Sequence, residues 1–88
     1  MTRIEKVLDT VLGGHAGANI PFGDVVRLLD ALGSESRIKG DHHIFTFPGI
    51  DEILNLQPRA SLAKEYRVRQ VRNVIVKYRL RFRDFPQV

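Results

Sequence analysis

The sequence predicts an α+β domain in which a three-stranded antiparallel sheet carries helices on one face, in the order α-α-β-β-β-α. Apolar residues recur at helical spacing in residues 2–32 and again in residues 66–79. Between them, residues 35–56 hold three short runs of β-branched and aromatic residues, separated by glycine and proline turn signals. A chain of 88 residues can bury only one modest core, so we expect residues 1–88 to form a single domain.

A first helix is predicted over residues 2–12. Thr2 and Glu5 have the spacing of a capping box, in which each side chain binds the backbone N–H of the other residue. Gly13 and Gly14 then end the helix, and the small and polar residues 15–19, which include His15, are predicted to form a surface loop. Five apolar residues share one face of this helix: Ile4, Val7, Leu8, Val11 and Leu12.

A second helix is predicted over residues 21–32, and it opens the core of the domain, residues 20–80. Pro21 suits the first turn of a helix, where a missing N–H costs nothing, and Gly33 suits the C-terminal cap. The buried stripe consists of Phe22, Val25, Val26, Leu29 and Leu32.

Three strands are predicted at residues 35–39, 44–47 and 53–56. Gly40-Asp41 and Pro48-Gly49 separate them, and these connections are short enough for an antiparallel meander.

A basic loop over residues 58–64 leads to a last helix, residues 66–79. Residues 81–88 are predicted to form a tail, and the sequence does not decide whether this tail packs on the domain or frays. The core face of the last helix consists of Val68, Val71, Val74, Ile75 and Tyr78.

The composition favours a folded protein with neither disulfides nor a membrane anchor. Hydrophobic residues make up 43% of the chain, well above the level of disordered proteins. Cysteine is absent, which excludes disulfides and thiolate chemistry and favours the cytoplasm. No apolar run approaches the length of a bilayer span.

Positive charge is concentrated in the C-terminal third of the chain. Residues 1–58 hold five basic and eight acidic residues, whereas residues 59–88 hold nine basic and two acidic ones. A basic surface of this kind is typical of a nucleic-acid-binding protein. A well-solvated helix that uses arginine would have the same composition, and the charge alone does not separate the two interpretations.

Titratable side chains crowd together in the run Lys39-Gly40-Asp41-His42-His43. Histidine both accepts and donates a proton near neutral pH, so a pair of histidines beside a lysine suits phosphodiester cleavage. A metal site is a poorer interpretation, because adjacent residues of a strand point to opposite faces and no third ligand completes a set. The alternative is that both histidines are ordinary turn and strand residues.

Two segments of the chain resemble HicA toxins. The run Gly33–Phe47 is similar to the family core, in which a short strand leads to a glycine-serine-histidine-histidine turn. Residues 52–57 and 63–72 are similar to the segments that precede and open the last helix in one HicA branch. The resemblance covers about residues 20–80, and it implies a small ribonuclease with a fold like that of double-stranded-RNA-binding domains.

Carried over by position, the resemblance implies that His43 is the catalytic residue and that His42 is auxiliary or structural. Gly40 is expected to adopt a positive φ at the turn. Asp41 replaces the serine usual in the family, and a carboxylate there either orients a neighbouring imidazole or repels the substrate phosphate. Glu65 and Arg67 also depart from the usual proline and glutamine. The candidate RNA-binding residues are Lys39, Lys64, Arg67, Arg69 and Arg72.

The resemblance implies an endoribonuclease that cleaves single-stranded RNA or mRNA without a metal or other cofactor and is neutralised by a HicB-like antitoxin. Two alternatives stay open: a non-catalytic RNA-binding module, and a decayed toxin that retains only antitoxin binding. The sequence does not decide whether the chain forms a homo-oligomer.

Overall fold

Six elements follow one another in the computed structural model, which describes residues 2–13, 20–58 and 60–83. Their order confirms the predicted one, and each predicted helix boundary lies within one residue of the observed boundary. None of the described helices has the length and apolar character needed to cross a bilayer. The elements are α1 (Arg3–Gly13), α2 (Phe22–Ala31), β1 (Glu35–Lys39), β2 (His42–Phe47), β3 (Ile50–Leu56) and α3 (Glu65–Tyr78).

Helix α1 begins with the predicted capping box. The Thr2 N–H donates to Glu5 Oε1 at 2.8 Å, and the Glu5 N–H donates to Thr2 Oγ1 at 3.2 Å. These bonds, above all the one from the Thr2 N–H, lower the pKa of Glu5. The predicted loop of residues 15–19, with His15, lies outside the described residues.

Helix α2 begins one residue later than predicted, because Pro21 is its N-cap rather than part of its first turn. The ψ of Pro21 is 136°, an extended value, and Pro21 forms a β-bridge with Leu62. This bridge holds Pro21 outside the helix although its φ of −57° would suit one. After the helix, Gly33 has a φ of +97°, as expected of a glycine that ends a helix.

The sheet is an antiparallel meander in the order β1-β2-β3. Strand β2 begins two residues before the predicted start, and β3 begins three residues before it. Lys39 pairs with His42 and Phe47 pairs with Ile50, so the hydrogen-bonded ladder continues up to both turns. The residues next to the turns include polar ones, which apolar character alone does not assign to a strand. Gly40 and Gly49 form these turns with φ values of +65° and +80°.

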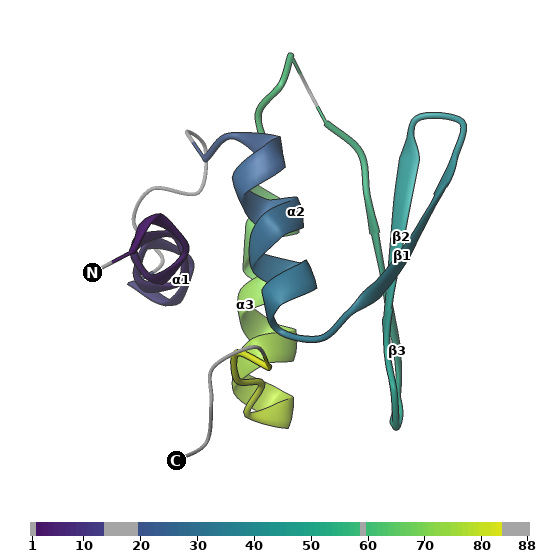
Figure 1. Ribbon diagram of the computed structural model, residues 1–88. Helices are drawn as coiled ribbons and strands as arrows, with labels where there is room; N and C mark the ends of the chain where they lie inside the picture. Colours follow the sequence, from purple (N-terminus) through teal and green to yellow (C-terminus); the bar gives the residue numbers. More distant parts are fainter. Residues whose placement is uncertain (1, 14–19, 59, 84–88) are drawn as a thin grey trace.

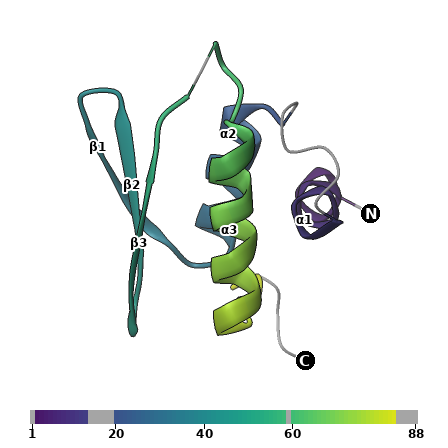
Figure 2. The same ribbon diagram turned by 180° about the vertical axis from the view of Figure 1, so that it is seen from behind.

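The molecule has three layers (Figures 1 and 2). The sheet forms one side, α2 and α3 lie next to each other against one of its faces, and α1 lies behind these two helices, away from the sheet. The main core lies between the sheet and the α2–α3 layer. It includes Phe45 and Phe47 of β2, whose side chains are buried.

The described part of the C-terminal tail docks on the helical layer. The Arg83 N–H donates to the Ala31 carbonyl at 2.8 Å, and Phe82 is half-buried against the core. Phe85 and Pro86 lie outside the described residues.

Candidate functional site

The two neighbouring histidines lie on opposite faces of the sheet, as predicted from the alternation of side chains along a strand. Both belong to β2, at the end next to the Gly40 turn. His43 has the same parity as Phe45 and Phe47, whose side chains are buried under the helices. The side chain of His42 is 48% exposed and contacts groups of the opposite face. The pair therefore cannot act together on one substrate atom.

His43 is half-buried at the margin of the core. Its ring makes an edge contact with the ring of Phe22, with centroids 4.8 Å apart and planes at 70°. It also stacks on Phe45, with centroids 6.5 Å apart and planes at 15°. On the sheet, His43 pairs with Ile38 of β1 and Leu56 of β3. The imidazole is thus oriented by the rings of Phe22 and Phe45 while part of it stays accessible.

His42 belongs to a polar cluster on the open face of the sheet. Its Nδ1 lies 3.0 Å from Asn55 Oδ1, and its Nε2 lies 3.7 Å from Asp41 Oδ1. The Gln57 side-chain amide donates to Asp41 Oδ2 at 2.6 Å. Asp41 therefore contacts both His42 and Gln57.

The beginnings of both core helices lie at the same end of the molecule as the Gly40 turn (Figure 1). Two backbone bonds join the α2 start to the segment before α3: the Phe22 N–H donates to the Ser61 carbonyl, and the Ala63 N–H donates to the Ile20 carbonyl, both at 2.9 Å. Neither N-cap residue, Pro21 or Lys64, makes a side-chain cap hydrogen bond. At the α2 start the Phe22, Asp24 and Val25 N–H groups already donate to backbone carbonyls. Because N–H groups at a helix start favour anions, it is the α3 start that suits a phosphate group.

Two of the predicted RNA-binding residues lie at this end. Lys64 is the N-cap of α3, and Arg69 lies just over one turn into that helix. Both line a hollow of about 510 Å³ that is also lined by Leu62 and Tyr66. Arg69 makes an exposed ion pair with Glu65 at 3.4 Å.

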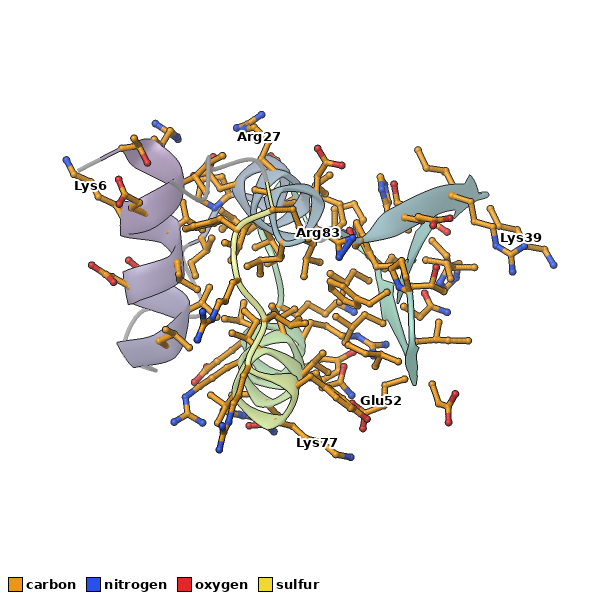
Figure 3. The ribbon with its side chains drawn as sticks, turned by 60° about the horizontal axis from the view of Figure 1, so that its bottom comes forward. Lys6, Arg27, Lys39, Glu52, Lys77 and Arg83 are labelled. Carbon is orange, nitrogen blue, oxygen red and sulfur yellow. The ribbon has the colours of Figure 1, made fainter. Side chains whose placement is uncertain are left out.

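The other three predicted cations do not gather at the hollow. Lys39 pairs with His42 at the tip of the sheet, where Figure 3 shows it far from the helices. Arg72 faces α1, where its Nε donates to the Leu12 carbonyl at 3.2 Å. Arg67 lies over the Tyr66 ring, 4.8 Å from its centroid, but lines the separate groove between α3 and β3. The five cations are therefore dispersed over several surfaces.

Two features of this end could not be found in the sequence. Phe22 reads as one more member of a helical apolar stripe, and nothing in its spacing indicates contact with His43. Ala60 and Ser61 adopt positive φ values of 50° and 65°, which are rare for residues other than glycine. Glycine is the usual sequence signal for a positive φ, and neither position carries glycine.

Among residues 2–13, 20–58 and 60–83, no group of three or more histidine, cysteine, aspartate or glutamate side chains is arranged to hold a metal ion. Comparison with family models, curated proteins and solved structures finds no match for this chain.

Proposed function

We propose that this chain is a HicA-type endoribonuclease toxin that cleaves single-stranded RNA with His43. The observation that carries the proposal is the position of His43. Its imidazole is partly accessible, is oriented by Phe22 and Phe45, and lies on the side of the sheet on which α2 and α3 begin. An oriented imidazole near a surface that favours anions is what general-base cleavage of a phosphodiester requires.

The proposed reaction is an intramolecular transesterification. Neutral His43 accepts the proton of a ribose 2′-OH, and the 2′ oxygen attacks the adjacent phosphorus atom. A new P–O2′ bond forms, the P–O5′ bond breaks, and the leaving 5′ oxygen takes a proton from the His43 imidazolium. The products are a 2′,3′-cyclic phosphate and a 5′-hydroxyl. Negative charge develops on the phosphate oxygens, and in this proposal Lys64 and the N–H groups at the α3 start stabilise it.

His42 has a supporting role in this proposal. Because its ring lies on the open face, within a cluster with Asp41 and Asn55, it does not share a substrate phosphate with His43. The departure at Asp41 therefore acts first on His42. We propose that cleavage needs no metal, that a HicB-like antitoxin of acidic character covers His43 and Lys64, and that both proteins act in the cytoplasm.

The experiment compares purified wild type with His43→Ala, His43→Gln and His42→Ala on a long unstructured RNA in EDTA. Loss of a positioned acid/base group typically lowers the rate on the order of 10²- to 10⁴-fold, so we expect that loss for both His43 variants. His42→Ala is the matched control on the opposite face and should lose much less activity. The wild-type rate should rise with pH as neutral imidazole replaces imidazolium.

Folding and RNA binding are measured on the same samples, because His43 also packs against Phe22 and Phe45. A folded His43→Ala protein that cuts at the wild-type rate would contradict the assignment. The same packing is typical of a structural histidine, and it favours a second candidate, a non-catalytic RNA-binding module. Wild type that binds RNA and never cuts it would select that candidate or, if the protein also bound an antitoxin, a decayed toxin.

A further inference from the structure

The hollow at the start of α3 shares Lys64 with the proposed cleavage site and contains two further groups, Tyr66 and Arg69, that the cleavage reaction does not use. Its volume of about 510 Å³ is in the range of small-ligand sites. Leu62, Ala63 and Tyr66 supply apolar surface, and Lys64, Glu65 and Arg69 supply charged groups. A hollow lined by an aromatic ring and by two cations suits a ligand that has both a flat ring and a negative charge.

Tyr66 distinguishes this hollow from the rest of the surface. Its side chain is 44% exposed, whereas Phe22, Phe45 and Phe47 are all buried. Two cations lie over the ring: the Arg67 guanidinium carbon is 4.8 Å from the centroid, and Lys64 Nζ is 5.9 Å from it, so a stacked base takes the place of one of them. An exposed aromatic ring beside cations is the usual platform on which single-stranded nucleic acids stack their bases.

The backbone at the margin of the hollow is held in a costly conformation. Ala60 and Ser61 are consecutive non-glycine residues with φ values of 50° and 65°. Such residues are strained, and residues of this kind cluster at active sites and ligand clamps. The Ser61 carbonyl accepts the Phe22 N–H at 2.9 Å, and the Phe22 ring contacts His43. The strained segment therefore connects the hollow directly to the residue that packs on the catalytic histidine.

We infer that this hollow is a nucleotide subsite for single-stranded RNA, in which one base stacks on Tyr66 and a neighbouring phosphate binds between Lys64 and Arg69. The inference rests on the proposed function and adds to it a second contact for the strand, separate from the contacts at His43. The hollow has an excess of positive charge, because Glu65 supplies one carboxylate whereas Lys64 and Arg69 supply two cations. Its ion pair with Arg69 is long and exposed, so a phosphate can take its place.

Tyrosine fluorescence gives a direct test, because the chain has two tyrosines and no tryptophan. In a Tyr78→Phe protein, Tyr66 is the only tyrosine, so all tyrosine emission reports on the hollow. Titration with a short unstructured oligoribonucleotide should quench this emission with the same midpoint as binding. A Tyr66→Phe protein, which keeps Tyr78, is the matched control and should show little quenching. Full binding without quenching in the Tyr78→Phe protein would overturn the stacking assignment.

Affinity is measured by fluorescence anisotropy in a His43→Ala background, which should leave the labelled RNA uncut. Tyr66→Ala should weaken binding on the order of 5- to 150-fold, the range for loss of one stacked base, whereas Tyr66→Phe should stay within about twofold. Lys64→Gln should weaken binding more than Lys6→Gln, a control with the same charge change on α1, where Figure 3 shows Lys6 on the far side of the molecule from the sheet.

The results separate the subsite from the nuclease. If Tyr66→Ala is folded and binds RNA as the parent protein does, the subsite is wrong, whatever the cleavage assay gives. If Tyr66→Ala loses affinity while the protein with His43 intact never cuts RNA, the subsite stands and the nuclease proposal fails. If the subsite and nuclease are both correct, Tyr66→Ala with His43 intact raises the KM for RNA more than it lowers kcat.

Discussion

Asp24 is the only buried charged residue in the described part of the chain, and it joins α1 to α2. Arg3 donates from Nη2 at 3.0 Å and from Nε at 3.2 Å, and Arg27 donates from Nη2 at 2.8 Å. Burial alone would raise the pKa of Asp24, but the hydrogen bonds, first of all those from Arg3, lower it. The carboxylate therefore stays ionised and holds an arginine from each helix.

Replacing Asp24 with asparagine should destabilise the fold, because a charge-assisted acceptor is lost while the shape is kept. Allowing for the exposed arginines, we expect a loss of about 1–2 kcal/mol in the free energy of unfolding near neutral pH, measured by urea denaturation. Asp30→Asn, at an exposed position of the same helix, is the matched control.

The pH dependence of this loss follows from the lowered pKa of Asp24. A carboxyl group whose pKa is lower in the folded state contributes its full stability above its ordinary pKa, and the contribution disappears as pH falls through the lowered value. The difference between wild type and Asp24→Asn should therefore shrink in acid. A difference of the same size at every pH would contradict the ion-pair explanation.

At the scale of single residues, the sequence predicts local features better than contacts. The capping box of Thr2 and Glu5 and the opposite faces of His42 and His43 follow from spacing alone, and both are observed. The contact of Phe22 with His43 and the burial of Asp24 depend on how distant segments pack. No periodicity in one sequence encodes them.

The β1–β2 hairpin depends on the backbone of Gly40. Its φ is +65°, and a Cβ added there would meet no atom within 4 Å. The position therefore restricts backbone conformation and leaves space for a side chain. Gly33 differs, because its φ is +97° and a Cβ would lie 2.7 Å from Arg83 Cδ.

Gly40→Val should destabilise the protein by about 1–2 kcal/mol, because a β-branched residue is strained in the left-handed region. Gly40→Asn should be tolerated better, since asparagine adopts this region more readily than most residues. The measurement is the midpoint of chemical denaturation of the three proteins. Equal midpoints for valine and glycine would show that the turn does not need a positive φ at Gly40.

The sequence predicts the type and order of every element, but it does not predict where β2 and β3 begin or where α1 packs. The strands begin earlier than predicted because His42 and Ile50 pair next to the turns, where pairing rather than apolar character decides the strand. The position of α1 behind the helical layer depends partly on Arg72, which donates to the Leu12 carbonyl from sixty residues away. Such a contact is visible only once the chain is folded.

The positive charge of the whole molecule is less concentrated in space than along the chain. Lys77 pairs with Glu52 of β3 at 3.1 Å, as Figure 3 illustrates, and Arg72 faces α1. Lys64 and Arg69 line the hollow at the start of α3. A strand of RNA held there would contact few of the nine basic residues that follow residue 58.

The number of phosphate groups that the protein neutralises can be measured from the salt dependence of its RNA-binding constant. For single strands, the logarithm of the binding constant falls with the logarithm of salt concentration with a slope of about −0.7 for each phosphate neutralised. Two contacts, from Lys64 and Arg69, give a slope of about −1.4, whereas nine would give about −6. We expect the smaller value from anisotropy titrations across a salt series with His43→Ala protein. Lys64→Gln should reduce the slope further by about 0.7, and Lys6→Gln should leave it unchanged. A slope near −6 would mean that RNA wraps around several faces of the molecule, and the single-end binding surface would then be wrong.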